Sequence, residues 1–120
     1  MSYDFMMFKP RNRIEVMDDI KPENLAQQSG DAVKIELSRL YPATEWENRG
    51  DRGWFGQLTA DGDWYEFRIH AGEDECWTIA TSEGNPRPEL VAKICAALRL
   101  LAFDGQSLEL IDSQGRRPAQ

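Results

Sequence analysis

The chain has 120 residues, of which 41% are hydrophobic and 29% charged, and this composition is typical of one domain spanning residues 1–120. Its formal net charge of −7 argues against nucleic acid as a partner, because affinity for nucleic acid depends largely on Lys and Arg side chains that neutralise phosphates. An anionic membrane surface would repel the same charge, and no segment approaches the roughly 18 consecutive apolar residues of a membrane-spanning helix.

The first elements in chain order are a strand and a helix joined by an irregular connection. Residues 3–8 are apolar or aromatic on both parities, which predicts a strand that is buried on both faces and central in its sheet. Residues 9–28 contain two prolines and many charges, which favours an irregular connection. We expect a helix over residues 32–41, because its apolar residues repeat at helical spacing and Ser29 or Asp31 can cap it.

The middle of the chain consists of short runs of strand-forming residues separated by turns. These runs are residues 43–48, 53–60, 63–71 and 76–82. An Asp-Gly pair between the second and third runs predicts a tight hairpin, and the links are too short for crossover connections, so the runs form an antiparallel meander. Gly56 lies inside the second run, which indicates a bulge or the close approach of a large neighbour.

A second helix follows the meander. Residues 89–103 carry an apolar stripe at helical spacing, and Pro88 suits the first turn of a helix. Gly105 is expected to end this element, and residues 107–112 form a last short strand. Residues 113–120 are polar and are expected to be a flexible tail.

This order of elements predicts an α+β fold. Each helix has one apolar stripe and needs a sheet face to cover it, so the simplest arrangement packs both helices on one face of an antiparallel sheet, as a two-layer sandwich. Residues 63–71 alternate strictly between polar and apolar, and we expect the odd-numbered side chains to meet the helices. The even-numbered side chains then form a row on the other face: Trp64, Glu66, Arg68 and His70.

This row has three interpretations. It can be a solvated sheet face, because alternating charges on exposed strands support each other. It can be a surface that contacts a partner. It can also be catalytic, because a histidine beside a glutamate can act as a general base, although the sequence offers no nucleophile or oxyanion site to complete such a centre.

Metal and cofactor sites lack their sequence signals. Cys76, Cys95 and His70 lie far apart without ligand spacing, and residues 73–75 lack the spacing of a calcium loop. No phosphate-binding or dinucleotide-binding glycine motif is present. We therefore predict no metal, no cofactor and no catalytic residue. The two cysteines are interpreted as reduced thiols and, without a signal-peptide pattern, the expected location is cytoplasmic.

Two segments carry a resemblance. The opening "MSYDFMMFKP" resembles the starts of many small acidic bacterial proteins, several of which are similar to immunity proteins of interbacterial polymorphic-toxin systems. The later "LVAKICAALRLLAFDGQSLELID" resembles their closing pattern of apolar helix, Phe-Asp turn and short strand. The resemblance implies a non-catalytic protein that binds and inhibits one cognate toxin.

A partner surface follows from this hypothesis. Acidic charge would steer the protein to a basic toxin domain, and exposed aromatic residues would anchor the contact. The candidate partner-binding residues are Trp64, Glu66, Arg68, His70, Phe55, Trp46, Glu73, Asp74 and Glu75. Two alternatives stay open: a small enzyme or ligand-binding domain that uses the Glu66, Arg68 and His70 row, and a structural subunit that forms a homodimer.

Overall fold

Eight strands form one antiparallel sheet in the computed structural model, which describes residues 2–120, and their order is β10-β9-β8-β1-β7-β5-β4-β3. The strands are β1 (Ser2–Phe8), β3 (Glu45–Asn48), β4 (Trp54–Ala60), β5 (Asp63–Ile69), β7 (Cys76–Ser82), β8 (Leu101–Asp104), β9 (Glu109–Asp112) and β10 (Gly115–Pro118). A separate two-stranded ribbon pairs β2 (Gln28–Ser29) with β6 (Glu73–Asp74). The helices are α1 (Gly30–Leu40) and α2 (Glu89–Leu98), and short 3-10 turns occupy η1 (Met17–Asp19), η2 (Pro22–Asn24) and η3 (Gly50–Arg52).

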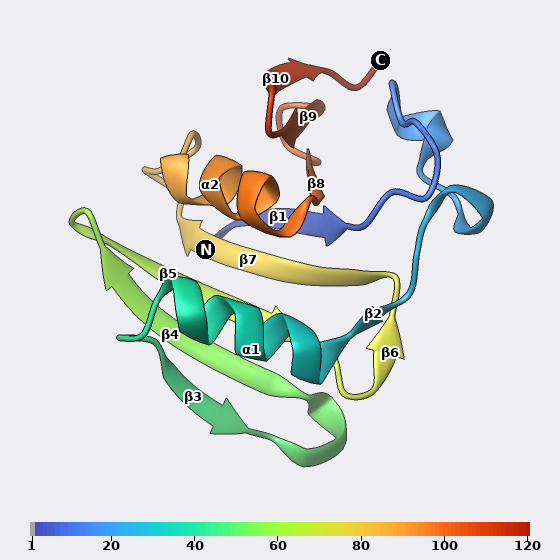
Figure 1. Cartoon of the computed structure of the whole chain (residues 1–120). Helices are drawn as coiled ribbons and strands as arrows, with labels where there is room; N and C mark the ends of the chain where they lie inside the picture. Colours follow the sequence, from blue (N-terminus) through green and yellow to red (C-terminus); the bar gives the residue numbers. More distant parts are fainter. Residues whose placement is uncertain (1) are drawn as a thin grey trace.

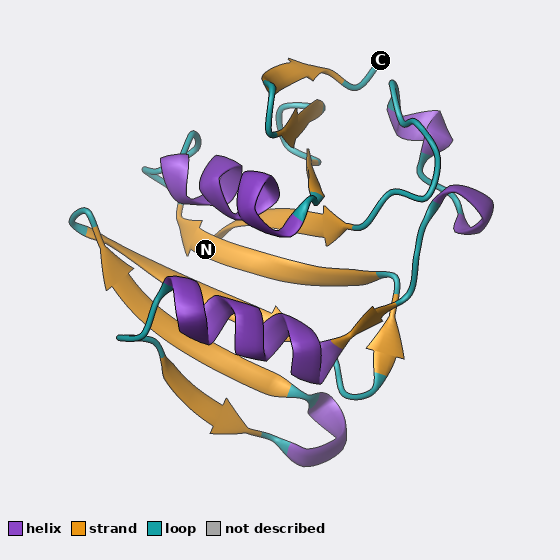
Figure 2. Ribbon diagram, viewed as in Figure 1, coloured by secondary structure: helices purple, strands orange, loops and turns teal. Residues whose placement is uncertain are grey.

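Both helices cover the same face of the sheet, which confirms the predicted α+β sandwich (Figures 1 and 2). The side chains Val33 of α1 and Ile94 of α2 belong to one hydrophobic cluster with sheet residues such as Phe5. The odd-numbered residues of β5 face this cluster as predicted, and Trp77 and Ile79 of β7 join them: Tyr65, Phe67, Ile69, Trp77 and Ile79 are all buried. Neither helix is long and apolar enough to cross a membrane, and residues 2–120 contain no other candidate.

The predicted first helix is present and begins two residues earlier than expected. Ser29 caps it, because its Oγ accepts a hydrogen bond of 3.3 Å from the backbone N–H of Ala32. Val33 and Leu37, one turn apart, are buried against the sheet. Ile35 lies outside this stripe and is 49% exposed.

The predicted second helix is too long. It ends at Leu98, where Arg99 adopts a left-handed conformation with φ of 57°, and residues 101–104 form strand β8 instead. β8 pairs with β1 on one side and with β9 on the other. Its two faces meet different clusters, because Ala102 belongs to the helix-covered cluster and Leu101 to the cluster on the outer face. A strand buried on both faces is a continuous apolar run, which periodicity cannot distinguish from the last turn of a buried helix.

Strand β1 is central, as predicted, but only part of its outer face is buried. Asp4 and Met6 are exposed on the face opposite the helices. Phe8 is buried on that face in a second hydrophobic cluster, which residues 9–28 and the C-terminus complete: Ile14, Leu25, Leu101, Leu110 and Ala119. The irregular connection therefore covers one end of the outer face.

The expected flexible tail is ordered as a strand. Residues 115–118 form β10 at one edge of the sheet. Arg117 donates a hydrogen bond to the backbone carbonyl of Ile14 at 2.7 Å. Ala119 is fully buried, and its carbonyl accepts a hydrogen bond from the N–H of Met17 at 2.6 Å. The polar composition of this segment did not predict a strand, because the segment is held by side chain–backbone hydrogen bonds and by one buried alanine, not by an apolar pattern.

Candidate functional site

The outer face of the sheet is uncovered over β3, β4 and β5. On these strands the outward residues are exposed or half-buried, in contrast to the outer face of β8 and β9, where the second hydrophobic cluster lies. Trp64, near the start of β5, is the large exposed apolar side chain of this open region, and 43% of its surface is exposed. The open face is therefore the first candidate for a binding surface.

Strand register brings together one polar row on this face. Glu45 of β3 pairs with Gln57 of β4, and Gln57 pairs with Glu66 of β5. Directly paired residues of neighbouring strands point to the same face, so the three side chains lie side by side. Two strand spacings place the backbones of Glu45 and Glu66 roughly 10 Å apart. Trp64 lies beside this row, opposite Thr59.

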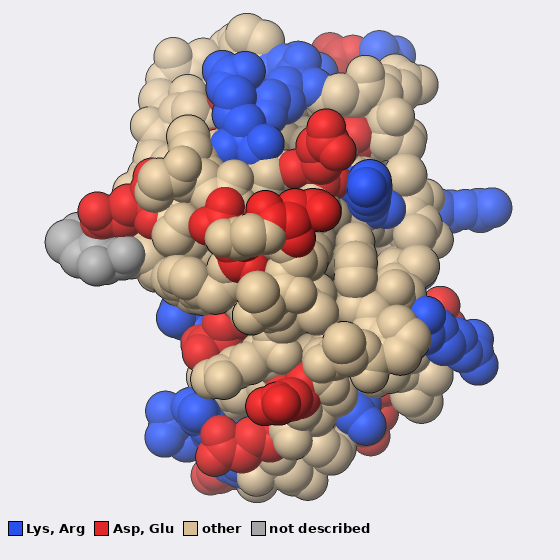
Figure 3. Space-filling model, turned by 90° about the vertical axis from the view of Figure 1, so that its left-hand side faces the viewer, with Lys and Arg blue, Asp and Glu red and all other residues tan. Residues whose placement is uncertain are grey.

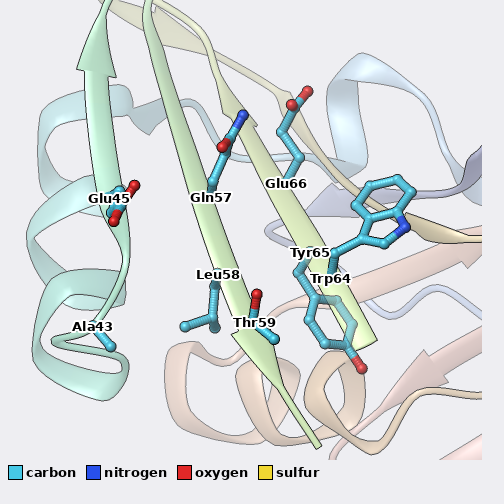
Figure 4. A pocket seen from close by; sticks show the side chains of 8 residues that line it. All are labelled: Ala43, Glu45, Gln57, Leu58, Thr59, Trp64, Tyr65 and Glu66. Carbon is cyan, nitrogen blue, oxygen red and sulfur yellow. The ribbon is translucent and has the colours of Figure 1, made fainter. Parts of the chain in front are cut away.

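A cleft of about 510 Å³ opens at this row. It forms where β3 begins, because β3 pairs with residues 54–57 of β4 and leaves residues 58–60 without a neighbour on that side. The lining residues are Ala43, Glu45, Gln57, Leu58, Thr59, Trp64, Tyr65 and Glu66. Figure 4 shows Glu45 and Glu66 on either side of Gln57, with the indole ring of Trp64 next to Glu66.

The polar groups of the cleft are suited to a cation. Its lining contains two carboxylates and no Lys, Arg or His. Arg68 Nε lies 2.6 Å from Oε1 of Glu66 and compensates that carboxylate, whereas Glu45 has no ion-pair partner within residues 2–120. Burial raises the pKa of Tyr65, and its hydroxyl accepts a hydrogen bond of 2.9 Å from the Asn85 side chain. The cleft offers oxygen acceptors and an aromatic ring, and its lining lacks the Ser, Cys or His of a nucleophilic centre.

The next row of the open face already contains an arginine. Glu47 of β3 pairs with Phe55 of β4, and the guanidinium carbon of Arg49 lies 3.7 Å from the centre of the Phe55 ring. The same guanidinium makes an ion pair of 2.8 Å with Glu47. Phe55, a predicted partner-binding residue, therefore lies on the open face, but Arg49 covers its ring.

His70 does not belong to the open face, although its parity predicted that it would. Its Nδ1 lies 3.1 Å from the carbonyl oxygen of Cys76, and its Nε2 lies 2.7 Å from that of Gln28. β5 ends at Ile69 and the chain turns at Gly72, so strict alternation stops before His70. The histidine joins β5 to β2 and β7, and the predicted Glu66, Arg68 and His70 row is reduced to its first two members.

Trp46 also lies elsewhere, on the helix-covered face. Its ring stacks on Phe67 at a centroid distance of 6.0 Å. A Cβ atom at Gly56 would lie 2.7 Å from this ring, which confirms that Gly56 permits the close approach of a large neighbour. Trp46 is thus a core side chain, because Glu45 and Glu47, not Trp46, take the outward positions of β3.

The acidic segment lies at the other end of β5 from Trp64. Glu73 and Asp74 form β6, which pairs with β2, and both are exposed, whereas Glu75 is half-buried. The side of the molecule in Figure 3 shows carboxylates and cations interspersed, with the largest basic group at the top, so charge is not segregated there. No group of three or more His, Cys, Asp or Glu within residues 2–120 is placed to hold a metal ion.

The sequence identified part of this site. Trp64, Glu66, Arg68 and Phe55 share the open face, whereas Glu45 and Thr59 of the cleft were missed. Comparison with known proteins finds no matching family model, no matching curated protein and no matching solved structure. The function is therefore argued from the geometry of the open face.

Proposed function

We propose that the protein is a non-catalytic binding domain that neutralises a basic bacterial toxin by direct contact, as an immunity protein of a polymorphic-toxin system. The observation that carries the proposal is the open face of β3, β4 and β5, on which a half-exposed tryptophan adjoins a cleft lined by acceptors. Tryptophan is enriched among the residues that dominate binding energy in protein interfaces.

The charge of the chain supports a basic partner. The formal net charge is −7, and the uncompensated carboxylate of Glu45 lies in the cleft itself. Opposite charge raises the rate of association more reliably than it raises affinity, which suits an inhibitor that must capture a toxin quickly. The face is carried by paired strands, so little conformational entropy is lost on binding.

The proposed place of action is the cytoplasm. Cys76 and Cys95 are both free thiols, and cytoplasmic proteins keep their thiols reduced. A toxin that attacks cytoplasmic targets would meet its inhibitor there.

The test is neutralisation of a candidate toxin. The neighbouring genes are first searched for a toxin domain. We expect co-expression of this protein with such a domain to restore growth of the host, and calorimetry to give a one-to-one complex. Trp64→Ala should weaken binding at least tenfold, because truncating a central interface tryptophan typically costs about 2 kcal/mol or more. Ile35→Ala is the matched control, because Ile35 is as exposed but lies on α1.

Two results would contradict the proposal. One is a wild-type protein that neither restores growth nor binds the toxin. The other is an equal loss of affinity in the Trp64 and Ile35 variants, which would show that affinity depends on exposed apolar area in general and not on the open face.

The acidic segment supplies a second measurement. We expect the triple substitution of Glu73, Asp74 and Glu75 by lysine to slow association with a basic partner several-fold at low salt and to weaken its salt dependence. Stopped-flow association at two ionic strengths measures both effects. An unchanged association rate would remove this segment from the binding surface.

A further inference from the structure

We infer that the cleft beside Trp64 binds an arginine side chain of the partner protein. This inference rests on the proposed function and adds the chemical group that the open face recognises. It follows from the acceptors of the cleft, from the exposed indole ring and from the neighbouring row of the same face.

The acceptors face the cleft from both sides. Glu45 on one side has no ion-pair partner among the described residues, and Glu66 on the other side uses Oε1 for Arg68, which leaves Oε2 free. Gln57 lies between them (Figure 4). A guanidinium group presents five N–H donors in a plane, so it can reach acceptors on both sides of a cleft, whereas an ammonium group is a compact point charge.

The indole ring of Trp64 supplies an aromatic surface next to these acceptors. Arginine stacks on tryptophan faces more readily than other cations do. The position of Trp64 is fixed by its backbone, because its carbonyl accepts a hydrogen bond of 2.8 Å from the Thr81 hydroxyl in addition to the strand pairing.

The adjacent row shows the same combination with its arginine in place. There a β3 carboxylate, Glu47, holds Arg49 at 2.8 Å, and the guanidinium lies 3.7 Å above the aromatic ring of Phe55. At the cleft the β3 carboxylate is Glu45, and the aromatic ring is Trp64, which lies one row further along β5, opposite Thr59. No Lys or Arg lines the cleft itself, although Arg68 pairs with Glu66 at its edge. An arginine from the partner would meet a carboxylate and a nearby aromatic ring there, as Arg49 meets Glu47 and Phe55.

The experiment uses the whole protein and a pair of matched probes. N-acetyl-L-arginine amide is titrated into ¹⁵N-labelled protein, followed by N-acetyl-L-citrulline amide, which has nearly the same shape without the charge. We expect the Trp64 indole N–H and the Gln57 side-chain amide signals to shift, and the arginine probe to bind at least fivefold more tightly than the citrulline probe. Glu45→Gln should weaken binding of the arginine probe at least threefold.

The control variant is Glu83→Gln, which removes one negative charge at an exposed position outside the cleft and should leave the affinity unchanged. Amide spectra of each variant without probe establish that it is folded. Equal affinity for both probes, or equal effects of the two Glu→Gln changes, would overturn the inference. A lysine probe that binds as tightly would overturn the choice of arginine.

Two further outcomes separate this inference from the proposed function. If the protein neutralises a toxin but its cleft does not bind the arginine probe, this inference is overturned and the proposed function stands. Sedimentation that shows a dimer in the wild type and a monomer after Trp64→Ala would assign the face to a second copy of this chain, and would overturn both.

Discussion

Gln28, at the start of β2, is buried and joins three separate parts of the chain through its side-chain amide. Its Nε2 donates hydrogen bonds to the carbonyl oxygens of Met7 at 3.2 Å and Glu75 at 3.1 Å. Its Oε1 accepts a hydrogen bond of 3.0 Å from the indole N–H of Trp77. Its backbone carbonyl is the oxygen that His70 contacts. We expect Gln28→Ala to be among the most destabilising substitutions in the protein.

The magnitude follows from the groups left without partners. The indole N–H of Trp77 and the carbonyl of Met7 would lose these bonds at buried positions, and an unpaired buried polar group costs about 1–3 kcal/mol. The cavity left by the missing side chain adds to this cost. Gln28→Ala should therefore lower the free energy of unfolding by about 4 kcal/mol, a large share of the roughly 5–15 kcal/mol that stabilises a domain. The thermal midpoint should fall by roughly 15 °C.

Urea denaturation followed by tryptophan fluorescence measures the change, provided that the slope of the transition stays constant. The matched control is Gln27→Ala, because the neighbouring Gln27 is exposed and should change stability by less than about 0.5 kcal/mol. A loss of less than about 1 kcal/mol in Gln28→Ala would refute the reasoning, since it would mean that water or rearranged side chains satisfy the groups that Gln28 holds.

Three other predictions concern the backbone, the histidine and the thiols. Gly53→Ala should lower the free energy of unfolding, measured by urea denaturation, by about 3 kcal/mol or more, because φ of Gly53 is 88° and a Cβ atom there would lie 1.9 Å from a backbone oxygen. The control is Gly84→Ala, which should be nearly neutral because a Cβ atom at Gly84 would lie in open space. His70→Ala should fold and lose about 2 kcal/mol by the same assay, because at least one of the two backbone carbonyls within reach of the ring nitrogens loses its donor. Burial raises the pKa of Cys76 to about 11 and that of Cys95 to about 12, so only a small fraction of each thiol is the reactive thiolate at pH 8. Iodoacetamide should therefore alkylate both at least about a hundredfold more slowly in native protein than in urea. Mass spectrometry measures the two rates.

The meander was predictable because its signals are local. Asp61 and Gly62 have φ of 54° and 80°, which are the positive angles that an Asp-Gly hairpin favours, and the turn sets the register of β4 on β5. Once that register is fixed, alternation decides which side chains of β5 are buried. Tyr65, Phe67 and Ile69 followed the prediction because the strand is paired on both sides along most of its length.

The errors in the fold occur where local pattern and tertiary contact disagree. The run from Leu98 to Phe103 is apolar apart from Arg99, and one arginine also fits the polar side of a helix, so composition does not indicate that the helix stops. The change depends on the left-handed conformation of Arg99. β10 shows the opposite case, in which a polar segment is ordered because Arg117 and Ala119 contact residues 9–28 from the far end of the sequence. Such contacts have no periodic signal.

The candidate site was predicted only as far as single strands allow. Trp64 and Glu66 follow from the alternation of one strand, but the cleft needs Glu45 beside Gln57. That pairing depends on the register set by residues 49–53, an irregular turn that contains η3. Trp46 was misplaced because four residues of β3 do not reveal their phase.

The two ends of the outer face differ in what covers them, and this difference bears on function. At the end formed by β8 and β9, Phe8 and Leu110 are enclosed by residues 9–28 and by Ala119. At the end formed by β3, β4 and β5, Trp64 stays exposed although burying an aromatic side chain contributes about 1.5–3 kcal/mol. A chain that already covers one apolar region of this face with an irregular segment leaves the other region uncovered. The exposed part of the tryptophan therefore contributes little to the stability of the isolated protein, and a partner that encloses it would gain the free energy of its burial as affinity.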